Sequence, residues 1–427
     1  MALPFIVQWL QLQAEREFRE HRDAFSMPEE TFRLRYRLTK DMARWLCEEL
    51  RHDLERRRTG TRTAATVEQQ VLCALRFFAT GSYQGAIASD EDLATSQSSV
   101  SRSIHAVVEA IVERLGDEWI AFPASAQELA AAKEGFLNMD ARFAGCIGAV
   151  DGTFICIRAP YDTDDNNKAA YFCRKGYYAL NAMVTLICRD AATAIIKRKA
   201  IKAALGNHHE RNTGVESQSY SCIACSWLYC CCWLPSNPHK TLQVCDATLR
   251  ITALEPTYPG SVHDAFVWRA STLSREFSAG SRGQGGEFLL GDSAYPLQPW
   301  LLNPIPGAHQ AGSPAAQFNR AHSSLRCVVE RCFGVLKARF RYLQRYRALY
   351  YGPLFTSKII AACVVLHNLC VRQQLPEPDD IPGTEEREDP DLYDDGDDDG
   401  AAVGMYQAGA QRRDHLLRCF TASQDST

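Results

Sequence analysis

The chain has 427 residues, of which 46% are apolar and 23% are charged, and its formal net charge is −4. No continuous apolar run reaches the ~18 residues that a membrane-spanning helix requires, so we expect no membrane segment. The 17 cysteines occur without a recognisable secretory leader. This favours reduced thiols in an intracellular protein over a disulfide scaffold.

The first part of the chain, residues 1–135, is expected to form a helical N-terminal region. In EQQVLCALRFFATGSY, apolar residues recur at helical spacing. The segment DEDLATSQSSVSRSIHAVVEAIVERL is read as two helices around a short turn, with Ser98 or Ser99 capping the second. This predicts a helix-turn-helix that presents Arg102 to DNA, although any pair of packed helices gives a similar pattern.

The pattern changes over residues 140–374, which are predicted to form a mixed α/β domain. GCIGAVDGTFICIRA is a nearly continuous apolar run typical of a buried strand, and GYYALNAMV and VCDATLRITAL are read as two more strands. GEFLLGDSAY is a short strand that ends in an acid. Two amphipathic helices follow, in SSLRCVVERCFGVLKARFRYL and SKIIAACVVLHNLCVRQQ.

The C-terminal segment, residues 375–427, is expected to be an acidic disordered tail. Residues 376–400 contain thirteen acids and one arginine, so they contribute a charge of −12 while the rest of the chain sums to +8. Prolines and glycines interrupt the segment, and it has no periodic apolar positions. Such a tail either keeps the protein soluble or mimics nucleic acid over a basic cleft, and both alternatives remain open.

Four acids lie where a folded core rarely tolerates a charge: Asp151, Asp264, Asp292 and Glu330. Buried carboxylates persist when they are paired, hydrogen-bonded or bound to metal. A set of oxygen ligands suits Mg²⁺ or Mn²⁺ rather than zinc. Two such ions about 3.5–4 Å apart activate a water and stabilise the leaving oxygen of a phosphodiester.

Each acid alone has a simpler explanation. Asp292 could cap SAYPLQPW, and Glu330 could pair with Arg326 four residues before it. The metal prediction depends on the four acids as a set and on the basic residues of the last long helix. Long basic side chains usually form a solvated face, but these are also candidates for contacts with a phosphate backbone: Arg326, Arg331, Lys337 and Arg339.

Several ordered blocks resemble harbinger transposase-derived nucleases, the domesticated branch of the PIF/Harbinger DDE transposases. They are GAVDGTFI, KGYYALNAMV with VCD, YPGSVHDA, LLGDSAYPL, NRAHSSLRCVVERCFGVLKARFRYL and ACVVLHNLC. The resemblance covers roughly residues 28–374. It implies an RNase H-like fold and divalent-metal ligands at the four acids, with Asp151, Asp292 and Glu330 as the catalytic triad and Asp264 as a supporting ligand.

The resemblance also implies DNA as the substrate, a separate Myb/SANT-like DNA-binding partner, and a location in the nucleus as well as the cytoplasm. The sequence itself offers only a weak basic signal for nuclear import, ERRRTGTR at 55–62. We therefore expect a divalent-metal-dependent DNA endonuclease. The alternative is a catalytically silent DNA-binding or scaffolding protein that retains the fold.

Residues 185–243 interrupt the block in which NAMV would continue directly into VCDATLR. This segment of 59 residues holds six cysteines, five of them in SCIACSWLYCCCW, without the two spaced ligand pairs of a zinc site. It shows no sustained helical or strand periodicity. We interpret it as a translated intron, and the alternative is a lineage-specific loop within the domain.

Overall fold

The computed structural model describes residues 23–56, 65–93, 95–160, 168–173, 175–182, 243–254, 258–259, 261–344, 349–378 and 400–421. Its chain contacts divide these residues between two units. The first unit comprises residues 1–119, 331–349 and 358–387, and the second comprises residues 120–330, 350–357 and 388–427. Most of segment 185–243 therefore lies outside the described residues.

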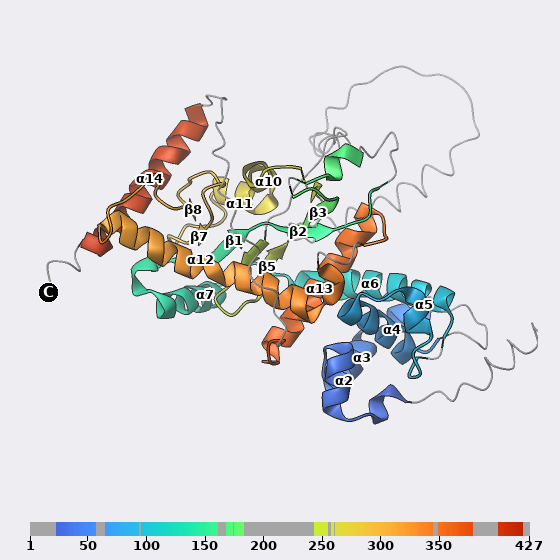
Figure 1. Ribbon diagram of the computed structural model, residues 1–427. Helices are drawn as coiled ribbons and strands as arrows, with labels where there is room; N and C mark the ends of the chain where they lie inside the picture. The colour runs from blue at the N-terminus through green and yellow to red at the C-terminus, as the bar shows by residue number, and fades with distance from the viewer. Residues whose placement is uncertain are drawn as a thin grey trace, which may run out of the picture. The chain divides into compact units, whose positions relative to one another are not determined.

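The first unit is helical (Figure 1). Its N-terminal helices are α2 (Glu29–Tyr36), α3 (Lys40–Arg56), α4 (Val67–Thr80), α5 (Gln84–Ala88) and α6 (Gln97–Trp119). The apolar faces expected of α4 and α6 are buried, which confirms the helical spacing. Thr66 caps α4 through a reciprocal pair of bonds with Gln69.

The two helices expected around residues 90–115 have different boundaries from those predicted. Residues 91–93 form a turn, closed by a hydrogen bond from the amide of Leu93 to the carbonyl of Asp90 at 3.1 Å, and the short preceding helix is α5. Ser96, rather than Ser98 or Ser99, caps α6, because its Oγ accepts from the amide of Ser99 at 3.2 Å. The prediction missed this because three neighbouring serines offer equivalent caps.

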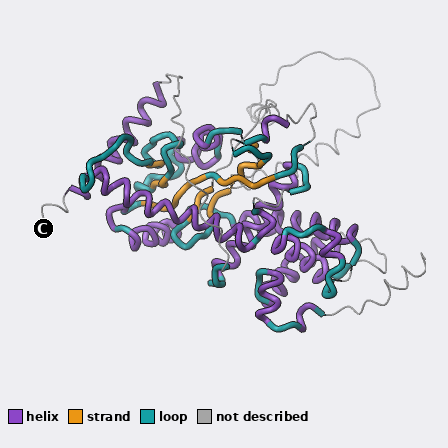
Figure 2. Tube along the Cα trace, viewed as in Figure 1, coloured by secondary structure: helices purple, strands orange, loops and turns teal. Residues whose placement is uncertain are grey.

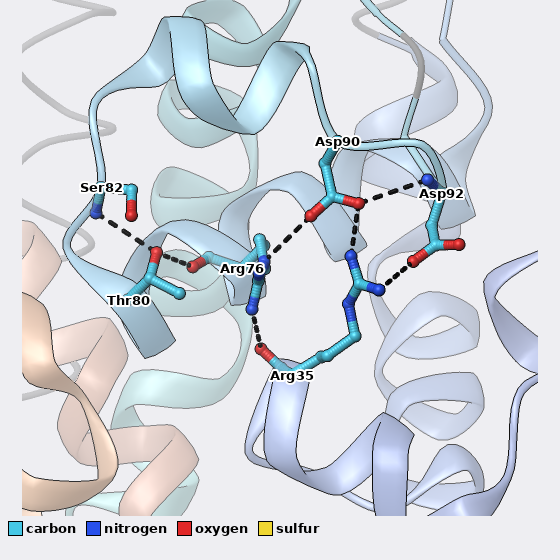
Figure 3. A network of polar contacts seen from close by, with 6 residues as sticks. All are labelled: Arg35, Arg76, Thr80, Ser82, Asp90 and Asp92. Atoms are coloured by element: carbon cyan, nitrogen blue, oxygen red, sulfur yellow. Dashed lines mark hydrogen bonds and ion pairs between the residues drawn. The ribbon is translucent and has the colours of Figure 1, made fainter. Parts of the chain in front are cut away.

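A partly buried ion network connects these helices (Figure 3). The guanidinium of Arg35 on α2 pairs with Asp90 and, at 2.8 Å, with Asp92, both of which precede α6. Arg76 on α4 pairs with the other oxygen of Asp90 at 3.2 Å and donates to the carbonyl of Arg35 at 3.4 Å. Three segments far apart in sequence are thereby held by one cluster of charges.

A five-stranded mixed sheet forms the centre of the second unit, with strand order β5-β4-β1-β7-β8. β4 runs antiparallel to its neighbours β1 and β5, whereas β7 is parallel to β1 and β8 is parallel to β7. Figure 2 shows these strands at the centre of this part of the chain. Their bounds are β1 Cys146–Asp151, β4 Gln243–Cys245, β5 Ile251–Leu254, β7 Phe288–Leu290 and β8 Leu301–Leu302.

A second sheet of three short strands continues from the first. It has the order β2-β3-β6, with β2 Thr153–Cys156, β3 Ala179–Ala182 and β6 Tyr258–Pro259. The predicted single strand through Asp151 is therefore two strands, divided at Gly152. Thr153 pairs with Ala182 in the second sheet, whereas Asp151 pairs with Gln243 in the first.

Helices cover the five-stranded sheet, and its core cluster draws on every strand of that sheet. Helix α7 (Ala126–Met139) packs against β1, while α10 (Asp264–Ala270) and α11 (Thr272–Ser278) contribute Trp268 and Phe277 to the cluster. The long helix α12 (Pro314–Arg339) carries Glu330. Among the described residues, short 3₁₀ helices lie in the second unit at Ala141–Phe143 and Lys168–Tyr171, and in the first unit at Ala24–Ser26 and Arg341–Leu343.

Helix α13 (Pro353–Arg372) is long and apolar enough to cross a membrane by length and composition alone. Within its most apolar window, however, 72% of the residues are buried inside the protein. In the first unit, Asn368 on this helix donates to the carbonyl of Trp119 at 2.7 Å. These are the properties of a core helix.

The C-terminal helix α14 (Gly400–Thr421) corrects the expectation that all of residues 375–427 are disordered. It packs against β8, and its Phe420 is fully buried beside Phe143 and Phe318. Arg413 donates to the side chain of Asn303 and the carbonyl of Pro304, each at 3.1 Å. The composition of residues 376–400 concealed an amphipathic segment that follows them.

Candidate active site

The sheet topology brings two of the predicted acids to one edge. Asp151 is the last residue of β1, and Asp292 lies two residues after β7. Because β1 and β7 are adjacent and parallel, their carboxyl ends lie at the same edge of the sheet. Glu330 is supplied by α12, and Asp264 is the first residue of α10.

The carboxyl of Asp151 is difficult to ionise. Burial raises its pKa to about 6, and the charges of Asp292 and Glu330 raise it as well, although Arg326 opposes them. The side chain of Asp151 is 18% exposed, so a small part of it reaches solvent. The structure therefore brings Asp151, Asp292 and Glu330 within electrostatic range of one another.

Arg326 lies between two of these acids. Its Nη1 donates to Oδ2 of Asp151 at 2.8 Å, and its Nη2 donates to Oε1 of Glu330. Burial lowers the pKa of the guanidinium, but the neighbouring carboxylates, Asp151 first, raise it above its ordinary value. The pairing of Glu330 with Arg326, considered above as the simpler explanation of that acid, is present in the structure.

Tyr295 lies within electrostatic range of Asp264 as well as of Asp151 and Asp292. Its phenol is buried, and burial followed by the charges of Asp264 and Asp151 raises its pKa well above the ordinary value. Among the described residues, its hydroxyl has no hydrogen-bond partner. The amide of Tyr295 bonds to the carbonyl of Asp292 at 3.3 Å, which holds the ring next to the site.

The other predicted phosphate contacts belong to the first unit, whereas the acids belong to the second. Arg102 is exposed on α6, and Lys337 is half-buried on α12. Arg331 is exposed and pairs with Glu377 at 2.6 Å. Arg339 is only 4% exposed and donates to the carbonyl of Pro376 at 3.4 Å, so its burial contradicts the expectation of an accessible phosphate contact.

Arg326 also differs from the expectation of an accessible basic side chain, since it is 9% exposed. Helical spacing indicates only its pairing with Glu330, because the two residues are four apart and share one face of α12. Tyr295 was not among the predicted site residues. Its only signal was its position three residues after Asp292 in GDSAYP.

The chemistry of the site fits a divalent cation. Asp151, Asp292 and Glu330 offer oxygen donors alone, which Mg²⁺ and Mn²⁺ prefer. Within the described ranges, no group of three or more His, Cys, Asp or Glu stands in metal-ligand positions. Arg326 is bonded to Oδ2 of Asp151 and Oε1 of Glu330, so coordination of a cation through these two oxygens requires the guanidinium to release them.

Part of the chain, including three of these acids, matches a known protein family. The family described as "DDE superfamily endonuclease" matches residues 225–368, a range that contains Asp264, Asp292 and Glu330 and begins within segment 185–243. No solved structure matches the chain.

Several curated proteins are similar over most of the chain. The protein named "Putative nuclease HARBI1" is 31% identical over 315 residues in both Bos taurus and Homo sapiens. In each case the alignment covers 73% of this chain and 70% of the relative. A shorter similarity, 29% identity over 170 residues, covers 35% of this chain and 40% of "Protein ALP1-like" of Arabidopsis thaliana.

Proposed function

This chain belongs to the harbinger transposase-derived nuclease family of DDE endonucleases, and we propose that it hydrolyses DNA phosphodiester bonds with a divalent cation. The observation that carries the proposal is the convergence of Asp151, Asp292 and Glu330 from two parallel strands and a helix. The mixed sheet, in which β4 alone is antiparallel, supports an RNase H-like arrangement of these acids.

In the proposed mechanism, Asp151, Asp292 and Glu330 hold the cation, with Asp264 in support. When bound, Mg²⁺ or Mn²⁺ supplies an activated water and stabilises charge on the leaving oxygen. The rigid ends of β1 and β7 fix Asp151 and Asp292, while α12 positions Glu330. Tyr295 is buried within electrostatic range of Asp264, Asp151 and Asp292.

The proposal includes a nuclear as well as cytoplasmic location and a Myb/SANT-like DNA-binding partner. Both rest on the family resemblance. Arg102, Arg331 and Lys337 remain proposed contacts for the DNA backbone, and they share the first unit with the candidate helix-turn-helix around α5 and α6. The second function under consideration is a silent DNA-binding or scaffolding protein.

Nicking of supercoiled plasmid by the purified full chain in Mn²⁺ or Mg²⁺ tests the proposal. We expect Asp151→Asn and Glu330→Gln to abolish nicking, because each removes a ligand charge. Asp117→Asn, which changes an exposed acid on α6, serves as the matched control and should nick normally. A wild-type chain that binds DNA but does not nick it under any of these conditions would favour the silent alternative.

A further inference from the structure

Both carboxylate oxygens of Asp151 are already engaged. Oδ1 accepts from the amide of Gly152 at 2.8 Å, and Oδ2 accepts from Nη1 of Arg326 at 2.8 Å. The other terminal nitrogen of the same guanidinium bonds to Glu330. One cationic side chain therefore holds the oxygens of two different acids that the proposed chemistry needs for a metal.

The environment makes this bridge strong. The side chain of Arg326 is 10% exposed, and those of Asp151 and Glu330 are 18% and 17% exposed, so little water screens the charges. The planar guanidinium presents its donors in a fixed fork, which allows it to reach both acids at once. Removing the charge of Arg326 would leave buried carboxylates to repel each other.

We infer that Arg326 competes with the divalent cation for Oδ2 of Asp151 and Oε1 of Glu330, so that its guanidinium must leave these two oxygens before the cation can be bound by them. This rests on the proposed function, because it assigns the cation to the same acids. Arg326 is then a positioning residue: it neutralises the acids in advance and sets how much cation is needed to fill the site.

The competition predicts that weakening the arginine strengthens cation binding. With Arg326→Gln, Mn²⁺ meets carboxylates that have no competing cation, and we expect binding about tenfold tighter, the equivalent of one lost charged hydrogen bond. With Arg326→Lys, a single ammonium cannot bridge both acids, so an intermediate affinity is expected. Arg320→Gln removes an exposed arginine from the same helix and should leave the affinity unchanged.

The test is a titration of the full chain with Mn²⁺ in the absence of DNA, with free Mn²⁺ measured by electron paramagnetic resonance. The double variant Asp151→Asn with Arg326→Gln locates the effect, since it should lose the gain. If Arg326→Gln folds only when Mn²⁺ is present, its thermal midpoint is measured at increasing Mn²⁺ concentration, and the rise of the midpoint reports the same affinity. Binding that is equal or weaker in both Arg326 variants would overturn the inference.

These measurements separate the inference from the proposed function, because none of them requires DNA cleavage. A chain that gains Mn²⁺ affinity when Arg326 is replaced, yet never nicks DNA, would refute the nuclease and leave the competition in place. A chain that nicks DNA through Asp151, but whose Mn²⁺ affinity is unchanged when Arg326 is replaced, would support the nuclease and refute the competition.

Discussion

Asp151 pairs with Gln243 in the β1–β4 ladder, whereas two residues further along the chain Thr153 pairs with Ala182 in the β2–β3 ladder. Continuing the β2–β3 register back to Asp151 places residue 184 opposite it, 59 residues before 243. Residues 185–243 number the same 59. Strands β3 and β4 thus have the register of one strand into which this segment has been added.

Deleting residues 185–243 should leave a folded protein of equal or greater thermal stability, because Val184 then stands opposite Asp151 and both ladders keep their register. Deleting 58 residues, 185–242, is the matched control. That deletion shifts the register by one and turns each side chain of β4 to the opposite face. Equal thermal midpoints for the two deletions would contradict the single-strand interpretation.

Sequencing the transcript across codons 180–248 tests the origin of the segment. The intron interpretation predicts a spliced message that joins NAMV to VCDATLR. A message that retains all 59 codons would make the segment a true loop between β3 and β4.

Asp151 should make the protein less stable as pH rises. Its pKa is about 6 in the folded state because of burial and the charges of Asp292 and Glu330, against an ordinary value near 3.8. Between those values the folded protein holds a proton that the unfolded chain has released, so the free energy of unfolding falls as pH increases.

Urea denaturation at a series of pH values from 4 to 7 measures this effect. We expect Asp151→Asn to flatten the fall, since asparagine does not titrate. Asp117→Asn should reproduce the wild-type curve. If the Asp151→Asn and wild-type curves run parallel over this range, the proton is bound elsewhere.

Substitutions at two glycines of α14 test whether this helix packs against the rest of the second unit. A Cβ at Gly409 would lie 2.9 Å from backbone atoms of Gln298, whereas a Cβ at Gly404 would meet nothing within 4 Å. We expect Gly409→Ala to destabilise the second unit, because the helix must move away from Gln298. Gly404→Ala should stabilise it by up to about 1 kcal/mol through helix propensity alone.

Thermal unfolding of both variants, with limited proteolysis of α14, measures the difference. Identical stabilities, or greater stability for Gly409→Ala, would show that α14 does not pack against Gln298 in solution.

Tyr295→Phe should stabilise the fold by about 1 kcal/mol, because it removes a buried hydroxyl that lacks a partner among the described residues. Tyr406→Phe, at an exposed position of α14, is the neutral control. Chemical denaturation gives the stability, and the nicking rate gives a second readout. A loss of stability in Tyr295→Phe would mean that the hydroxyl is bonded in solution.

Sequence patterns predicted which segments of the site form strands and helices more accurately than they predicted where those elements begin and end. VCDATLRITAL suggested one strand, but it forms β4 and β5, because the carboxylate of Asp246 accepts from the amides of Thr248 and Arg250 and closes a turn. Periodicity carries no information on such local bonds. The acids could be selected as candidates from their apolar surroundings, whereas the bridge by Arg326 depends on Asp151, 175 residues away.

The ion network of the first unit has a consequence for how relatives can vary. Asp92 pairs with Arg35, whereas Asp90 is shared by Arg35 and Arg76. Losing one partner leaves a buried charge, while replacing all members with apolar residues avoids that cost. Substitutions at these four positions should therefore appear together in any lineage.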